Sequence, residues 1–488
     1  MNRQAALALF LMAVFSATAQ LRNKNWYFGD GAGVRFDTGG PVALTTNLPS
    51  IQTASAMSDP QGNFLFLMTN PSVYDASLSS MPNGVGPWFP AGAQYQAIAI
   101  YPRATDPDLF DVVYRVAVPG PYTRCRLRYL LVDMALNGGS GDVFGSAMTV
   151  WGDSLIMSFA GATNTNGTDY WFLTHEINTD RFLAYAVGTA GLDTVPVPSS
   201  VGPVHFSASQ FSGDLQLAST QWAFNLQGDR LLTTGTYRSS GILIDSIPGL
   251  VELYAFDQAT GQVAPLLSIP GFRRPSDCEW SPSGDFIYLT DFDSLNTEHL
   301  FQFDLSSGDS SIIVASKTSL GTWQASGGTH QMQQGPDGRI YISRSGGPLG
   351  QSYLSCITAP DQPGLSSGYV ENFLSFYPEP WPGILPTMLK RYHDSDFPLA
   401  DHMAQQAYNE QLAVWPNPAN GQAFVKLPLS SGVDRLRILD AAGRLSMEVV
   451  PSEFTIQPLD LSGLAPGAYV LSALAAQQLV GSARFVVE

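Results

Sequence analysis

The stretch Trp280-Ser-Pro-Ser-Gly-Asp-Phe-Ile-Tyr-Leu-Thr-Asp291 combines a turn with a strand. Pro282 fixes a backbone φ that suits a turn, and Gly284 can adopt the positive φ that completes it. From Phe286 onward, aromatic and β-branched residues alternate with a period of two, which is the pattern of a β-strand. The stretch therefore predicts a tight turn that leads directly into a strand.

The same combination of turn and strand recurs along most of the chain. Its turns lie near residues 62, 108, 167, 228, 284 and 338, about 55 residues apart on average. All-β repeats of 40–60 residues with about four strands each, as in WD40-like proteins, indicate a β-propeller. Residues 20–393 would hold about seven such blades, within a range of six to eight. We expect strands within 26–47 to pair with strands near 353–376 and so close the ring.

The composition agrees with many short strands joined by turns. The 488 residues include 46 Gly and 34 Pro, and only 13% are charged. The net charge of −17 argues against binding to nucleic acid or to an anionic membrane surface. The cysteines at positions 125, 278 and 356 are too widely spaced for a CxxC motif. We expect three buried thiols in separate sheets, although a single disulfide with one cysteine left over is the alternative.

The first 19 residues have the three parts of a signal peptide. Arg3 gives a basic start, residues 5–15 are apolar, and Ala17-Thr18-Ala19 is an A-x-A cleavage site. Cleavage after Ala19 would leave Gln20 as the mature N-terminus. The apolar run is too short to span a bilayer, and no later segment is apolar enough for a membrane helix. The sequence therefore predicts a secreted protein.

The C-terminal part of the chain differs from the repeats. Prolines at 378, 380, 382 and 386 would interrupt any strand ladder, and we expect a linker over residues 394–410. Residues 411–488 contain short, evenly spaced strands. They predict a second domain, a small Ig-like β-sandwich.

Three motifs in this tail carry a resemblance to a known family: Trp415-Pro-Asn-Pro418, Leu436-Arg-Ile-Leu-Asp-Ala-Ala-Gly-Arg444 and Leu459-Asp-Leu-Ser-Gly-Leu-Ala-Pro-Gly-Ala-Tyr469. The tail resembles the type A C-terminal sorting domain of the Bacteroidetes type IX secretion system. The resemblance implies contact with that machinery, export across the outer membrane, and removal of the tail with release or attachment at the cell surface. Its motif residues here would be Pro416, Asn417, Pro418, Gly443, Gly467 and Tyr469.

Residues 25–393 are similar to a family of secreted Bacteroidetes propeller-like proteins. The similarity is carried by Asn25-Trp-Tyr-Phe-Gly29, Asp169-Tyr-Trp-Phe-Leu-Thr-His175 and Gln334-Gly-Pro-Asp-Gly-Arg-Ile-Tyr341, among other stretches. This family supplies no catalytic residues that could be transferred to the present sequence.

Histidines near strand ends are candidates for a site. His175, followed by Glu176, would be a ligand or an acid/base group at the mouth of the central channel, or a strand-end residue bonded to backbone. Together with His205 and His330, it would form a metal site if the three lay on inner strands of different blades.

Two further groups of residues have a functional and a structural interpretation. Asp291 and Asp293 are candidate Ca²⁺ ligands or members of an ordinary Asx-turn. Trp88, Trp323 and Trp381 lie in Gly/Pro-rich segments with Phe89 and Tyr377. Such aromatic loops stack on sugar rings, anchor protein interfaces, or simply pack the loop.

The sequence contains no Gly-x-Ser-x-Gly elbow, and paired catalytic carboxylates cannot be inferred without geometry. We therefore assign no catalytic residues. The predicted function is a secreted or surface-attached module that binds a protein or a glycan or acts as a scaffold. The alternative is a polysaccharide hydrolase or lyase with its site at the mouth of the channel.

Overall fold

The computed structural model divides the chain into two compact units, residues 1–397 and 398–488. The structure describes residues 21–488 except 29–30, 49–53, 70–71, 86–96, 119–123, 206–214, 240–241, 244–247, 325–329, 345–351, 377–384, 394–409, 413, 428–432, 441–443, 452–455 and 476–477. The predicted signal peptide, including Ala19, therefore lies outside the described residues.

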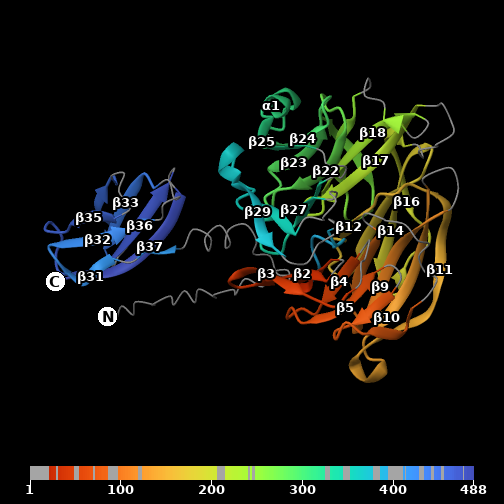
Figure 1. Ribbon diagram of the computed structural model, residues 1–488, viewed down its shortest axis with the longest axis horizontal. Coiled ribbons are helices and arrows are strands. Elements are labelled where there is room, and N and C mark those ends of the chain that lie inside the picture. The colour runs from red at the N-terminus through yellow and green to blue at the C-terminus, as the bar shows by residue number, and fades with distance from the viewer. Residues whose placement is uncertain are drawn as a thin grey trace, which may run out of the picture. The chain divides into compact units, whose positions relative to one another are not determined.

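The described strands of the first unit form seven antiparallel sheets (Figure 1). The first contains β1 (Asn25–Tyr27), β2 (Ala32–Asp37) and β3 (Gly40–Thr45); the second contains β4 (Ala54–Ser58), β5 (Phe64–Thr69), β6 (Ser72–Asp75) and β7 (Ser80–Val85). The third contains β8 (Ile98–Arg103), β9 (Asp106–Ala117), β10 (Cys125–Asp133) and β11 (Asp142–Leu155). The fourth contains β12 (Ala160–Thr163), β13 (Tyr170–His175), β14 (Thr179–Gly188), β15 (Gly191–Leu192) and β16 (Val197–His205).

The fifth sheet contains β17 (Leu215–Phe224), β18 (Arg230–Ser239), β19 (Ile242–Leu243), β20 (Leu250–Phe256) and β21 (Val263–Ser268). The sixth contains β22 (Pro275–Trp280), β23 (Phe286–Phe292), β24 (Thr297–Asp304) and β25 (Thr318–Gln324); the seventh contains β26 (His330–Gln334), β27 (Ile340–Arg344), β28 (Tyr353–Ile357) and β29 (Tyr369–Ser375). The described helices are short: α1 (Ser310–Ala315), η1 (Leu21–Asn23), η2 (Asn137–Gly139) and η3 (Gly364–Ser367).

The predicted turns join the first two strands of most sheets. Gly284 has a φ of 76°, and its N–H donates to the carbonyl oxygen of Ser281 over 3.0 Å. Equivalent bonds close the turns at Gly62, Gly167, Gly228 and Gly338. The prediction near residue 108 is wrong in detail, because β9 already begins at Asp106 and the turn comes directly after β8.

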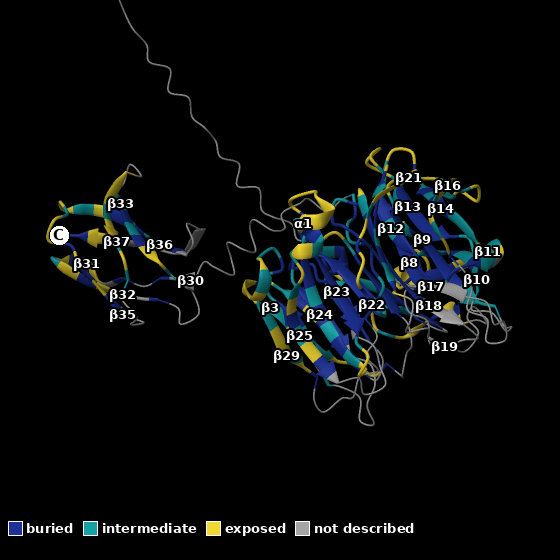
Figure 2. Ribbon diagram, turned by 90° about the horizontal axis from the view of Figure 1, so that it is seen from above, coloured by how far each residue is buried: buried dark blue, intermediate teal, exposed yellow. Residues whose placement is uncertain are grey.

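The first strand of each sheet lies near a common centre. β1 contacts β4, β4 contacts β8, β12 contacts β17, β17 contacts β22, and β22 contacts β26. Large buried side chains fill the spaces between adjacent sheets. In Figure 2, most strands of this unit are coloured dark blue, because their residues are buried. Sheets that stack around an axis in this way form a β-propeller.

The ring does not close by the strand pairing that we expected. β1, β2 and β3 pair only with one another among the described strands, and residues 353–376 belong to the seventh sheet. The two sheets instead meet through aromatic side chains. The ring centroids of Trp26 and Tyr341 lie 5.7 Å apart, and those of Phe28 and Phe376 are also 5.7 Å apart. Side-chain packing between sheets therefore replaces a shared ladder.

The three cysteines are buried thiols without a disulfide. They lie in three different sheets, Cys125 in β10, Cys278 in β22 and Cys356 in β28. This arrangement confirms the expectation of buried thiols in separate sheets and excludes the single disulfide.

The second unit is built from strands alone among its described residues. These strands are β30 (Glu410–Gln411), β31 (Val414–Asn420), β32 (Gln422–Lys426), β33 (Arg435–Asp440), β34 (Leu445–Val449), β35 (Ile456–Asp460), β36 (Gly467–Ala475) and β37 (Gln478–Val487). β31 pairs with β32 on one side and with β37 on the other. The strands of this unit enclose one hydrophobic core, which includes Leu436, Leu471 and Phe485.

Candidate functional site

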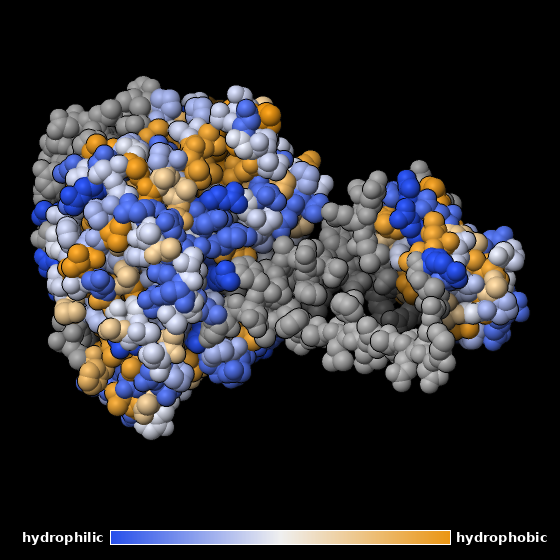
Figure 3. Space-filling view, turned by 180° about the vertical axis from the view of Figure 1, so that it is seen from behind, coloured by the Kyte–Doolittle hydropathy of each residue, from blue (hydrophilic) through white to orange (hydrophobic). Residues whose placement is uncertain are grey.

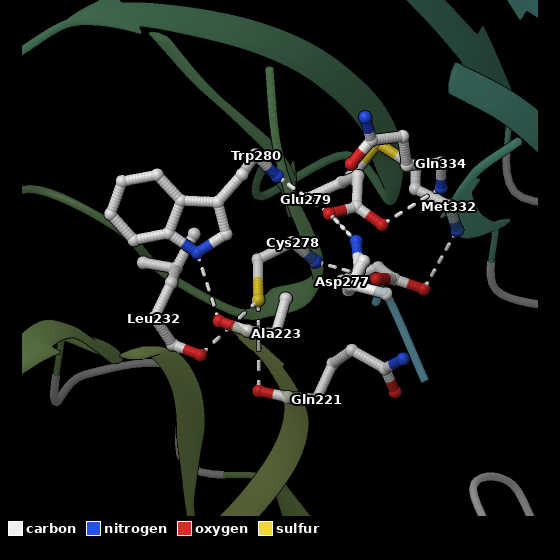
Figure 4. A network of polar contacts seen from close by, with 10 residues as sticks. Gln221, Ala223, Leu232, Asp277, Cys278, Glu279, Trp280, Met332 and Gln334 are labelled. Carbon is white, nitrogen blue, oxygen red and sulfur yellow. Dashed lines mark hydrogen bonds and ion pairs between the residues drawn. The ribbon is translucent and has the colours of Figure 1, made fainter. Parts of the chain in front are cut away.

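The inner strand β22 connects its two neighbouring sheets through alternate side chains (Figure 4). Asp277 and Glu279 point toward β26, where Asp277 Oδ2 accepts from Met332 N at 3.1 Å and Glu279 Oε2 accepts from Gln334 N at 2.9 Å. These carboxylates therefore satisfy backbone N–H groups on the free edge of β26. Both side chains are buried, which explains why their hydrogen bonds are needed.

The opposite face of β22 holds the sheet formed by β17 and β18. Trp280 Nε1 donates to Ala223 O over 2.8 Å. Cys278 Sγ lies 3.7 Å from Gln221 O and 3.8 Å from Leu232 O. Burial and the neighbouring Asp277 raise the pKa of the Cys278 thiol well above its usual range. This cysteine is therefore a packing residue without thiolate character.

Residues 385–393, which we name the channel segment, run through the centre of the ring. Leu385 N donates to Gln331 Oε1 of β26 over 2.8 Å. Thr387 N donates to Ala54 O over 2.9 Å, and Thr387 O accepts from Ser55 Oγ at 2.6 Å on β4. The segment is thus held through its backbone by inner strands on both sides of the channel.

The second half of the channel segment also contacts the surrounding strands and the N-terminal residues. Leu389 O accepts from Asn23 Nδ2 at 2.6 Å. The Leu389 side chain packs against Gly161 of β12, where a Cβ atom would lie 2.3 Å from Leu389 Cδ2. Lys390 Nζ forms an ion pair with Glu279 Oε1, and both side chains are largely buried. The channel is therefore filled by residues 385–393, which belong to none of the seven sheets.

A cavity of about 40 Å³ remains beside the channel segment. Gln221, Trp222, Glu279, Met332 and Lys390 are among the residues that line it. This volume fits one water molecule or two and is far too small for a sugar ring or a peptide.

The carboxylates at the channel do not form a catalytic pair. Burial, with Glu279 and Glu298 nearby, raises the pKa of Asp277 well above its usual range. Yet both of its oxygens accept backbone hydrogen bonds, from Cys278 N and from Met332 N. Asp277 and Glu279 also lie two residues apart on one strand, whereas a glycosidase needs carboxyl groups on either side of a bound sugar.

The histidine prediction is corrected by the structure. His175 ends β13 and His205 ends β16, so both lie in the fourth sheet and neither is on an inner strand. His330 begins β26, and its side chain is not described. The three histidines therefore do not converge from inner strands of different blades. Among the described residues, no three His, Cys, Asp or Glu side chains are grouped to hold a metal ion.

His175 and His205 nevertheless form a buried pair. Their ring centroids lie 4.2 Å apart with an angle of 35° between the planes. His175 Nδ1 lies 2.7 Å from Glu176 O, the backbone bond of the structural interpretation. Burial lowers the pKa of His175 to about 4, and burial with the adjacent His175 lowers the pKa of His205 well below its usual range. Both rings are therefore neutral at pH 7.

Asp291 and Asp293 have structural partners. Asp291 Oδ1 accepts from Arg273 N at 3.1 Å and from Arg274 N at 2.6 Å. Asp293 Oδ1 accepts from Leu295 N and Thr297 N, both at 2.8 Å, which is an Asx-turn. These bonds account for both side chains without an ion.

The tryptophan predictions meet different outcomes. Trp323 lies in β25 and not in a loop; its side chain is buried, and its Nε1 donates to Tyr369 Oη over 3.1 Å. Its expected role as an exposed stacking residue is therefore wrong, because Tyr369 covers it. Trp88, Trp381, Phe89 and Tyr377 lie outside the described residues.

The tail motif contributes specific contacts within the second unit. Asn417 Oδ1 accepts from Val486 N at 2.9 Å and ties β31 to β37. Gly467 begins β36, and Tyr469 Oη donates to Ala465 O over 2.8 Å while its ring stacks on Phe485. Pro416 and Pro418 flank Asn417 within β31. Gly443 lies outside the described residues.

Residues 413–488 match the family described as the secretion system C-terminal sorting domain. This tail is a type IX sorting domain. The protein that carries it is therefore secreted or attached to the cell surface, and the sorting domain implies an interaction with the type IX machinery. No helix among the described residues is long and apolar enough to cross a membrane.

Solved structures with similarity to the chain share little sequence with it. A functionally unknown protein from Desulfotomaculum acetoxidans has a TM-score of 0.39 and 11% identity, over 75% of this chain and 99% of its own. A putative 6-phosphogluconolactonase from Bacteroides uniformis has a TM-score of 0.36 and 13% identity, over 68% and 91%. The periplasmic gluconolactonase of Pseudomonas aeruginosa has a TM-score of 0.35 and 14% identity, over 84% and 95%. No curated protein sequence matches this chain.

Proposed function

We propose that the propeller is a binding module, delivered by the sorting domain to the cell surface or the medium, where it holds a protein or glycan ligand. The observation that carries this proposal is the filled channel. Residues 385–393 occupy the centre of the ring, and the remaining cavity of about 40 Å³ accommodates only water. A ligand would therefore contact the outer faces of the propeller.

The outer surface supports such a role. In Figure 3, hydrophobic patches lie next to hydrophilic ones on the propeller face that is visible. Exposed apolar side chains on β7 and β11 include Val85, Phe144 and Met148. Contiguous apolar patches with polar rims favour recognition of another molecule.

The alternative of a polysaccharide hydrolase at the channel mouth receives less support. Such an enzyme needs two carboxyl groups that face a bound sugar and a water molecule. The inner-strand carboxylates Asp277 and Glu279 instead bind backbone N–H groups and Lys390. Their side chains are buried, so a polysaccharide could not reach them without displacing the channel segment.

The proposal can be tested with the chain that lacks residues 1–19. The protein would be applied to arrays of polysaccharides and used to capture proteins from purified cell-surface fractions. We expect saturable binding to one class, with no release of reducing ends from the bound glycan. Absence of binding in both formats would refute the proposal, and steady release of reducing ends would favour the hydrolase.

A further inference from the structure

A sheet of the sorting domain has an outward face that departs from the usual pattern. In this sheet β34, β33, β36 and β37 pair in that order, and Figure 1 shows the last three side by side. An antiparallel sheet that packs one face on a core normally presents polar side chains on the other. The inward face follows this rule, because Leu436, Ile438 and Leu471 lie in the hydrophobic core. Part of the outward face is apolar as well.

Four apolar residues lie together on this outward face. Leu439 of β33 is paired with Leu445 of β34 and with Val470 of β36, and directly opposite residues project from the same face. Val486 of β37 is paired with Ala468, which lies two positions before Val470 on β36 and therefore shares its face. Leu445 and Val486 are 54% and 42% exposed, and Leu439 and Val470 are half-buried. We name these four residues the outer patch.

Charged side chains border the outer patch on the same face. Arg437 lies two positions from Leu439 on β33, and its Nε donates to Glu448 Oε2 over 2.8 Å. Arg435 Nη1 lies 3.3 Å from the other oxygen of the same carboxylate. The three charges are therefore paired with one another. An apolar centre with a polar rim is the composition of a protein–protein interface.

The outer patch coincides with the segments that carry the family resemblance. Leu439 lies within the motif at 436–444, and Leu445 directly follows it. Val470 directly follows the motif at 459–469. The inward side chains of these segments build the hydrophobic core, which accounts for their apolar character. Packing of the core does not account for the outward ones, and exposed apolar patches with polar rims mark sites of interaction.

We propose that the outer patch is the surface through which the sorting domain docks on an apolar surface of the type IX machinery. The family match implies that this part of the chain contacts the machinery. Removal of exposed apolar side chains from water would drive the association. The sheet needs no rearrangement for this contact, because the four side chains already face outward. The inference concerns export, so its test does not depend on what the propeller binds.

Export of the full chain by cells that carry the type IX system tests the proposal. The double variant Leu445→Lys/Val486→Lys places two charges in the outer patch. We expect roughly tenfold less propeller on the surface or in the medium, because charged groups oppose burial at the centre of an interface. Val195→Lys/Leu295→Lys is the matched control, since these propeller residues are 73% and 80% exposed. It should be exported like the wild type.

Further variants separate a lost contact from a lost fold. Leu445→Met/Val486→Ile keeps the outer patch apolar and should be exported like the wild type, whereas arrest of this variant would contradict the proposal. The purified double lysine variant should keep the urea unfolding midpoint of the wild type. If its midpoint is lower, Leu445→Lys alone decides, because Leu445 is the exposed first residue of β34.

A photoreactive p-benzoylphenylalanine at position 445 identifies what covers the outer patch. We expect a cross-link to a component of the type IX machinery, identified by mass spectrometry. A cross-link only to the propeller of the same chain, or to a second copy of the chain, would overturn the proposal. Normal export of the lysine variants, with arrest of a chain that lacks residues 411–488, would show that the machinery contacts another surface of the sorting domain and would also overturn it.

Discussion

Lys390 and Glu279 form a largely buried ion pair although they lie 111 residues apart in the sequence. The pair joins the channel segment to the inner strand β22. Glu279 also accepts backbone hydrogen bonds from Trp280 N and Gln334 N, so its carboxylate has three polar partners. This arrangement links the end of the propeller sequence to its sixth and seventh sheets.

Removal of the Lys390 charge should destabilise the propeller. Lys390→Met leaves Glu279 buried without its cation, and loss of one partner of a buried pair costs about 3–5 kcal/mol. We expect a lower free energy of unfolding in urea, followed by tryptophan fluorescence. The double variant Lys390→Met/Glu279→Gln should recover part of the loss, because no uncompensated charge remains. Equal stability of wild type and Lys390→Met would show that water already screens the pair.

The channel segment should be part of the folding unit of the propeller. A chain that ends after Phe397 keeps every described contact of residues 385–393, whereas a chain that ends after residue 384 loses them all. We expect the longer truncation to unfold cooperatively in urea near the full-length midpoint. The shorter one should unfold at lower urea or aggregate, because Leu385, Met388, Leu389 and Tyr392 leave the core.

Equal midpoints for the two truncated chains would contradict this role. In that case the segment would occupy the channel without contributing to stability. Leu389→Ala gives an independent check, because it removes the side chain that packs on Gly161 while leaving the backbone contacts in place. A buried Leu→Ala change typically costs about 2–5 kcal/mol.

The pair of His175 and His205 should make the propeller sensitive to acid. The pKa of His175 is about 4 in the folded chain, below its unfolded value near 6.5, because burial disfavours the charged ring. The stability that depends on a neutral His175 is therefore fully present above pH 6.5. It is lost as the pH falls from 6.5 to 4, by roughly 3 kcal/mol for this residue.

Urea unfolding at several pH values would measure this loss. His175→Phe keeps an aromatic ring of similar shape next to Phe182, and its free energy of unfolding should depend less on pH in this window. His299→Gln is the control, because His299 is partly exposed and paired with Asp293. An identical pH dependence in the wild type and in His175→Phe would refute the assignment.

Local sequence patterns predicted the strands and turns of the propeller because their causes are local. Gly284 and the alternation after Phe286 define a turn and a strand without reference to distant residues. The sorting domain could also be predicted from the sequence, because its motifs lie close together between Trp415 and Tyr469.

The channel could not be predicted in this way. Residues 385–393 show no periodic pattern, and their partners lie as far away as Asn23, 366 residues earlier. The prolines at 378, 380 and 382 lie outside the described residues, and Pro386, which lies in no strand, gave no sign that the segment fills the ring. Trp323 was misassigned for a related reason. Its neighbours Gly321 and Thr322 are typical of a loop, whereas its burial depends on Tyr369 from another sheet.

Deletion of residues 411–488 should stop the protein in the periplasm. The sorting domain is the part of the chain that implies contact with the type IX machinery, and its strands form a unit separate from the propeller. In cells that express the full chain, immunoblots should find the propeller in the medium or on the surface. In cells that express the deletion, the propeller should accumulate as a soluble periplasmic protein.

Lys390→Met is the control, because it weakens the propeller but retains the sorting domain, so its folded fraction should still be exported. Appearance of the deleted form in the medium, with a cytoplasmic marker retained in the cells, would show that residues 411–488 are dispensable for export.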